Sequence, residues 1–300
     1  MKTKFKGADA LLLESSALKA VFTVRGSKMV SLLDKVSGKE LLLQSNNDIL
    51  AQGCYDSDYN AADVCGFDEM YPNIDACYYE RSPWHGTKLP DHGEVWGLDW
   101  DCSQKGGCIE AQVRGVRLPY ILQKKIYFKN AETLRIDYTL ENLSPFDMDN
   151  AWAAHAMFAL EDGSKLVLPE SSGSGIVTYS HDGRVGRYGD VVPLNTIDAV
   201  LPEATYMDKV YLNAPVSNGR CGATFPSVGR TCLMAFPADS VPYLGVLVSN
   251  GLHLGNCAIL EPCTGALDRP DRARAFGMNN VLRAKGAQSW YLEFSVVDSR

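Results

Sequence analysis

The chain has 300 residues, of which 46% are hydrophobic and 22% are charged, and its formal net charge is -7 at pH 7. A chain of this length can bury roughly three quarters of the surface that it exposes when unfolded, which is enough for a large core. The negative charge and the scattered basic residues argue against nucleic acid as a partner, and no apolar run reaches the roughly 18 to 20 residues of a membrane-spanning helix.

The amino-terminal segment does not have the pattern of a secretory signal, because Asp9 and Glu14 interrupt its apolar part. We therefore expect a cytoplasmic protein. The nine cysteines are odd in number, irregularly spaced and without a CxxC pair. This pattern favours reduced, mostly buried thiols over a disulfide framework or a zinc site.

Strand patterns predominate along the chain. MVSLLDKVSGKELLLQ (29–44) predicts two short strands joined by a turn, TLRIDYTL (133–140) alternates apolar and polar residues, and SWYLEFSVV (289–297) repeats that alternation. A parallel sheet would need long helices between its strands, and no sustained period of 3.6 is present. We therefore predict mainly antiparallel sheets, and a single domain over residues 1–300, because no repeat or linker divides the chain.

Two polar, glycine-containing stretches, residues 51–107 and 161–190, show weak periodicity. Long irregular segments in compact proteins are usually binding loops or disordered. The first stretch is too rich in aromatic residues and cysteine for disorder. We expect it to be ordered and to line a binding site.

Within that stretch, LPDHGEVWGLDWD (89–101) places His92 close to Trp96 and Trp100. An aromatic ring can cover the apolar face of a ligand while polar side chains bind its edges. We expect His92 and Trp96 to form part of a pocket wall and Trp100 to lie in the core. The alternative for His92 is a turn residue that bonds a neighbouring carbonyl group.

Two further segments bring ionisable residues into apolar surroundings. If residues 152–158 form a strand, His155 shares a face with small alanines, which would leave room for a ligand. If residues 257–261 form a strand, Glu261 shares a face with Cys257 and Ile259. The alternatives are a hydrogen-bonded core histidine and a carboxylate at an exposed strand end.

The order of these motifs resembles the aldose 1-epimerase family, the galactose mutarotase-like proteins, over nearly the whole chain. The resemblance rests on the hairpin MVSLLDKVSGKELL, the loop PDHGEVWGLDW, the segment LRIDYTLENLSPFDM before a histidine, the LEP carboxylate and the final GAQSWYLEFSV. It implies an all-β fold, a large antiparallel β-sandwich (the galactose mutarotase-like supersandwich), with sugar bound on a concave face.

The resemblance also implies roles for individual residues. His155 corresponds to the family's general acid toward the ring oxygen, Glu261 to its general base toward the anomeric hydroxyl, and His92 to a histidine that orients the sugar. Asp208, in YMDKVYL, corresponds to a substrate-binding aspartate. The sequence departs from the family in the context of the central histidine, which here is NAWAAHA (150–156) with His155 inside it, and in having no match for the family's substrate-binding arginine.

The implied activity is interconversion of the α and β anomers of an aldose by ring opening and closure. A carboxylate with a pKa near 4 and an imidazole with a pKa near 6.5 can supply the base and the acid at neutral pH. This chemistry requires no metal and no other cofactor. The expected ligand is a monosaccharide, either a free aldose or a sugar phosphate, and the protein is expected to be a monomer or a homodimer.

Two other functions fit the same residues. A non-catalytic sugar-binding or sensing protein would need His92 and the aromatic wall but no acid–base pair. A glycoside hydrolase or polysaccharide lyase would pair Glu261 with a second carboxylate, for which there are four acidic candidates, Asp68, Glu69, Asp91 and Glu94. A phosphorylated sugar could be bound by three arginines, Arg81, Arg114 and Arg117.

Overall fold

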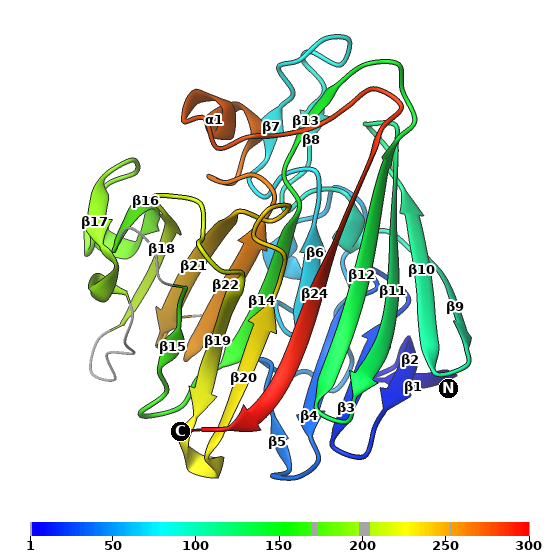
Figure 1. Cartoon of the computed structure of the whole chain (residues 1–300), viewed down its shortest axis with the longest axis vertical. Coiled ribbons are helices and arrows are strands. Elements are labelled where there is room, and N and C mark those ends of the chain that lie inside the picture. The colour runs from blue at the N-terminus through cyan, green and yellow to red at the C-terminus, as the bar shows by residue number, and fades with distance from the viewer. Residues whose placement is uncertain (1, 170–172, 198–204, 253, 300) are drawn as a thin grey trace.

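The computed structural model describes residues 2–169, 173–197, 205–252 and 254–299. Two large antiparallel sheets pack face to face, and short strands and one helix lie above one end of them (Figure 1). The fold is therefore the large antiparallel β-sandwich that the sequence predicts. No helix among the described residues is long and apolar enough to cross a membrane.

The first sheet has 12 strands and will be called the site sheet. In order across the sheet its strands are β1 (Lys2–Phe5), β2 (Ala8–Glu14), β3 (Leu18–Thr23), β4 (Met29–Asp34), β6 (Phe67–Met70), β14 (Ala153–Ala159), β22 (Cys257–Cys263), β21 (Tyr243–Asn250), β18 (Tyr206–Leu212), β16 (Ser174–Ser180) and β17 (Val191–Pro193), and β5 (Lys39–Glu40) pairs with β4.

The second sheet has eight strands and covers one face of the site sheet. Its order is β15 (Leu166–Val167), β19 (Arg220–Phe225), β20 (Arg230–Ala235), β24 (Ala287–Asp298), β12 (Thr133–Asn142), β11 (Tyr120–Asn130), β10 (Cys108–Arg114) and β9 (Asp101–Lys105).

The remaining elements are short. Two strand pairs, β7 (Cys77–Tyr78) with β8 (Lys88–Leu89) and β13 (Met148–Asn150) with β23 (Asn280–Leu282), lie near the α-helix α1 (Pro270–Ala275) at the upper end in Figure 1. The 3-10 turns are η1 (Tyr59–Ala61), η2 (Val95–Gly97), η3 (His181–Gly183), η4 (Leu194–Thr196) and η5 (Pro226–Val228).

The main core lies between the two sheets, and the alternating patterns in the sequence point toward it. In β12 the apolar residues Leu134, Ile136, Tyr138 and Leu140 are buried, as predicted. The alternation predicted for residues 289–297 and the hairpin of β4 and β5 are also confirmed. All nine cysteines are free and six of them are buried, as expected.

One ion pair is fully buried within this core. The ammonium of Lys124 lies 3.0 Å from the Glu69 carboxylate, and both side chains have no solvent exposure. Tyr138 and Trp152 donate to the same carboxylate at 2.8 and 2.7 Å, and the Ser27 carbonyl oxygen accepts from Lys124 at 2.7 Å. Partners on every side offset the cost of removing two charges from water.

The two irregular stretches contain more regular structure than the sequence suggests. The first includes β6, a central strand of the site sheet, and the second includes β16. As predicted, the first stretch is ordered and most of its aromatic residues are buried, although Tyr78 is exposed. β6 carries part of the candidate site, Asp68, to its place beside β14.

Candidate active site

Register across three strands of the site sheet brings the candidate groups together. Asp68 on β6 pairs with His155 on β14. The pairing of Ala156 with Leu260 then places His155 beside Glu261 on β22. Side chains paired in neighbouring strands share one face of a sheet, so these three lie in a row on the face turned away from the second sheet. The faces predicted for residues 152–158 and 257–261 are confirmed.

The two proposed acid–base groups lie close together. His155 Nε2 is 3.7 Å from Glu261 Oε1, and the exposed fractions of the two side chains are 5% and 0%. Glu261 Oε1 has no hydrogen-bond partner in the described structure. A buried acceptor without a partner is unusual and energetically costly, so this oxygen is placed to accept a proton or a hydrogen bond from a ligand.

The other oxygen of Glu261 is held by two side chains from β18. Lys209 Nζ lies 2.8 Å from Glu261 Oε2, and the Tyr211 hydroxyl donates to the same oxygen at 3.3 Å. Both side chains also contact Asp268 Oδ1, at 2.6 and 2.7 Å. Burial raises the pKa of Glu261 above its usual value, while Lys209 opposes that rise. The contact with an ammonium therefore favours the ionised carboxylate.

A glycine beside Glu261 leaves the room that this arrangement needs. Gly245 on β21 pairs with Glu261 and also with Tyr211. A Cβ atom at this position would lie 2.7 Å from Glu261 Oε2 and 3.0 Å from the Tyr211 ring. Any larger residue would thus displace the carboxylate or the phenol.

Burial changes the protonation expected for His155. It lowers the pKa of this imidazole well below 6.5, and the positive charges of His92, Lys209 and Lys28 act in the same direction. The pKa near 6.5 expected for this imidazole from the sequence therefore does not hold in the folded protein. His155 is neutral there and can still donate one N–H group, as neutral catalytic histidines do.

His92 lies at the rim of the same group of side chains. Its side chain is 20% exposed, and its ring lies 5.7 Å from that of His155. Nδ1 is 2.8 Å from an oxygen of Asp91. Burial alone would raise the pKa of Asp91. The hydrogen bond and the charge of His92 outweigh this effect, so the pKa of Asp91 is lowered. Nδ1 therefore donates to a carboxylate, and Nε2 is left for another partner.

Trp96 lies behind this rim. Its ring meets Tyr59 edge-on at 4.9 Å, and its indole N–H donates to the Asp91 carbonyl oxygen at 3.2 Å. Gly53 packs so closely on the indole that a Cβ there would lie 2.0 Å from it. Trp96 is only 6% exposed, so it supports Tyr59 and the rim in this structure. Trp100 is buried in the main core, as predicted.

Comparisons with known proteins show that the fold of this chain resembles a group of solved structures. No protein-family model matches the sequence. No curated protein matches it either. A galactose mutarotase-like protein from Lactobacillus casei superposes with a TM-score of 0.69 at 18% identity, covering 96% of this chain and 100% of that one. One from Clostridium acetobutylicum superposes with a TM-score of 0.70 at 12% identity, covering 99% and 98%.

A third structure, a galactose mutarotase related enzyme from Lactobacillus acidophilus, has a TM-score of 0.68 at 12% identity and covers 97% of this chain and 98% of that one. The chain has the galactose mutarotase-like fold. The fold expected from the resemblance is therefore confirmed over nearly the whole chain. At these low identities the likeness shows the fold alone, so an activity has to be argued from the residues of the site.

The mutarotase-like fold does not bring Asp208 to His155 and Glu261. Asp208 lies on the opposite face of β18 from Lys209, where Ser180 donates to it at 2.6 Å and Arg184 Nε donates to it at 2.6 Å. The contacts with Glu261 come from Lys209 and Tyr211 instead. The strand contributes to the site through the residue adjacent to the one that the resemblance indicated.

The other acidic candidates separate by face. Glu69 points into the core of the mutarotase-like sandwich, as described above. Glu94 accepts hydrogen bonds from the backbone N–H groups of Val116 and Arg117 and from the Tyr120 hydroxyl. Only Asp68 shares the row with His155 and Glu261. The four acidic candidates of the hydrolase alternative thus contribute one carboxylate to this row.

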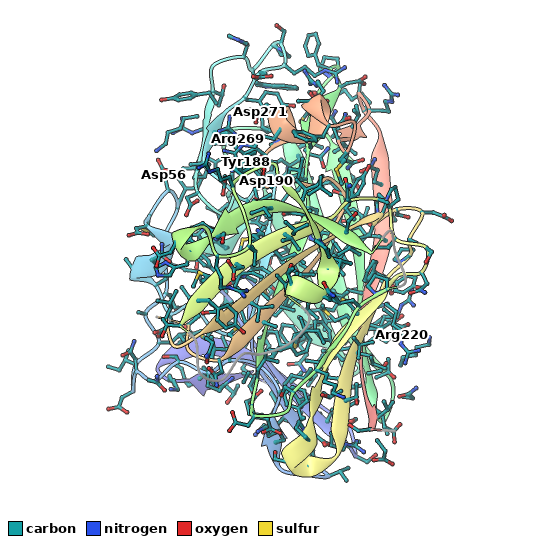
Figure 2. All side chains as sticks on the ribbon, turned by 90° about the vertical axis from the view of Figure 1, so that its left-hand side faces the viewer. Asp56, Tyr188, Asp190, Arg220, Arg269 and Asp271 are labelled. Carbon is teal, nitrogen blue, oxygen red and sulfur yellow. The ribbon has the colours of Figure 1, made fainter. Side chains whose placement is uncertain are left out.

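The three arginines considered for a phosphate lie outside this row, and Arg114 is exposed at the end of β10 in the second sheet. Arg81 pairs with Asp147 and Asp149, and Arg117 Nε donates to the Tyr55 hydroxyl. Other basic side chains lie near α1, where Arg272 pairs with Asp75 and stacks on Tyr188 with 4.7 Å between guanidinium and ring. Figure 2 labels Tyr188 in the same upper region as Arg269.

The pH dependence of stability can test the state of His155. Because its pKa is lowered in the folded protein, the unfolded chain alone takes up a proton there below about pH 6.5. As the pH falls below about 6.5, the unfolding free energy of the wild type should then decrease by about 1.4 kcal/mol per pH unit relative to that of His155→Gln. Above about pH 6.5 the difference between the two proteins should stay constant. Urea titrations of both proteins between pH 5 and 8 measure this difference. Parallel profiles would show that His155 titrates normally.

Proposed function

We propose that this protein is an aldose 1-epimerase that interconverts the anomers of a monosaccharide. The observation that carries the proposal is the 3.7 Å separation between His155 Nε2 and the unpartnered Glu261 Oε1. The reaction requires a base at the hydroxyl on C1 and an acid at the ring oxygen, and both oxygens are bonded to the same carbon. Two groups this close can therefore serve both oxygens of one sugar.

Every proton that moves in the proposed reaction can be supplied and taken up by Glu261 and His155. Glu261 takes the proton of the C1 hydroxyl, the bond between C1 and the ring oxygen breaks with its electron pair on that oxygen, and His155 gives its N–H proton to it. His155 is then an imidazolate, and the Glu261 carboxyl group returns a proton to it across the short gap, which regenerates the neutral imidazole and the carboxylate. Rotation of the aldehyde and the reverse steps on its other face give the other anomer.

The surroundings of the pair favour these roles. Burial alone would lower the pKa of Lys209. The negative charges and hydrogen bonds of Asp268 and Glu261 outweigh this effect and raise the pKa of Lys209. Lys209 thus remains an ammonium that stabilises the Glu261 carboxylate. Fixed charges in a site that excludes water interact more strongly than they would in solution.

The direct test follows anomer exchange by NMR with purified protein and a set of common free aldoses. We expect exchange faster than in buffer for at least one sugar, and about 10² to 10⁴ slower for His155→Gln. A wild-type rate equal to the buffer rate for every aldose would contradict the proposal. Sugar binding without exchange would indicate a non-catalytic binding protein, and release of products from oligosaccharides would indicate a hydrolase or lyase.

A further inference from the structure

Tyr59 fills the space in front of the two candidate histidines. It begins η1, which Asp58 caps by accepting from the Asn60 N–H. Its ring stacks on that of His92 with 3.8 Å between centroids and 10° between planes, and meets the His155 ring edge-on at 5.8 Å. The side chain is 3% exposed. A planar group bearing one hydroxyl therefore occupies the position next to both imidazoles.

The hydroxyl of Tyr59 contacts polar groups of the row. It donates to Asp68 Oδ2 at 2.8 Å and lies 3.4 Å from His155 Nδ1. Burial and the charge of Asp68 raise the pKa of Tyr59 well above its usual value, so the phenol is neutral and remains a donor. A sugar hydroxyl has the same capacity to donate and accept.

Asp68 and Glu261 flank His155 in closely similar settings. Each has one oxygen bound by a lysine and a tyrosine: Lys28 at 3.0 Å and Tyr59 for Asp68, Lys209 and Tyr211 for Glu261. The second oxygen of each carboxylate is buried and has no partner in the described structure. Asp68 thus presents an unused acceptor on the other side of the imidazole from the proposed base.

We propose that Asp68 is a sugar-binding carboxylate and that the Tyr59 phenol holds its place until sugar arrives. The inference rests on the proposed function. On binding, the segment that carries Tyr59, residues 51–66, moves so that a sugar ring replaces the phenol beside His92. A sugar hydroxyl then replaces the phenolic hydroxyl at Asp68 and His155, and Asp68 Oδ1 gains a donor. Residues 51–66 contain no strand, and Gly66 at their end accepts from the Met157 N–H of β14, so the part that moves is the part that precedes Gly66.

Two substitutions test the inference, because they are expected to change KM in opposite directions. Asp68→Asn weakens a charged acceptor for sugar, so KM should rise by about 10-fold or more while kcat changes less. Tyr59→Phe removes only the competing internal hydroxyl and keeps the pair of Lys28 with Asp68, so KM should fall by about 3-fold to 10-fold. Tyr55→Phe is the matched control, because Tyr55 lies on the same segment and donates to Glu94, outside the row.

The same samples distinguish failure of this inference from failure of the proposed function. Anomer exchange gives KM and kcat, and titration of the same aldose observed by protein NMR gives Kd. Exchange in the wild type with an unchanged KM in Asp68→Asn, or a higher KM in Tyr59→Phe, overturns the roles of Asp68 and Tyr59 alone. A wild type that binds aldose without exchange overturns only the catalytic proposal, and the variants' Kd values then decide the inference. No binding of any aldose overturns both.

Discussion

Glutamine in place of Glu261 should abolish most of the catalysed anomer exchange, with kcat/KM lower by about 10² to 10⁴. The substitution keeps the shape of the side chain but removes the oxygen that faces His155 as a base. Lys209 keeps a carboxylate partner at 2.6 Å in Asp268, so the buried ammonium remains paired and the fold should persist.

The measurement is the exchange rate under saturating and limiting sugar, with the buffer rate subtracted. Glu110→Gln serves as a control because Glu110 lies on the exposed face of β10, a strand of the second sheet, whereas the row lies on the site sheet. If Glu261→Gln retains the wild-type kcat/KM with an unchanged fold, Glu261 is not the base, and the acid–base pair must be sought elsewhere.

The largest stability effect is expected from Lys124→Met. The substitution leaves the Glu69 carboxylate in the core without its cation, and removing one partner of a fully buried pair typically costs about 3 to 5 kcal/mol. Tyr138 and Trp152 still donate to Glu69, but neutral donors compensate a buried charge only in part. Chemical denaturation of the variant and the wild type at pH 7 measures the loss of unfolding free energy.

Two further variants serve as controls for this loss of unfolding free energy. Lys129→Met breaks a pair with Glu293 whose lysine is 54% exposed, so it should cost no more than about 1 kcal/mol. Adding Glu69→Leu to Lys124→Met removes the uncompensated charge and should recover part of the stability, because an apolar pair can replace a buried ion pair while the Tyr138 and Trp152 donors lose their acceptor. A loss in Lys124→Met as small as that in Lys129→Met would contradict the prediction.

The parts of the fold visible in the sequence are those in which one face is apolar and the other polar. β12 and β24 alternate in this way, and their register follows from the alternation. β6 does not, because Asp68 and Glu69 stand side by side within it. Each of these carboxylates is compensated by a lysine from a distant part of the chain, Lys28 or Lys124, which no local pattern reveals.

The site could be predicted in part for the same reason. His155 and Glu261 are single ionisable residues in otherwise apolar strands, and strand parity gives their faces. β18 is buried along its whole length, so parity cannot indicate whether Asp208 or Lys209 faces the site. Tyr59 lies in a polar segment that no periodicity orders. The lowered pKa of His155 depends on burial and on charges from three other segments.

The order of strands in the eight-stranded sheet has a consequence for biosynthesis. β24 lies between β20 and β12, and it is the only described strand that links the half formed by β9 to β12 with the half formed by β15, β19 and β20. While the ribosome is still translating the preceding residues, both halves present open edges at which another chain can add. Nascent chains should therefore depend on chaperones until β24 has emerged, and loss of this strand should yield aggregates instead of a folded protein of lower stability.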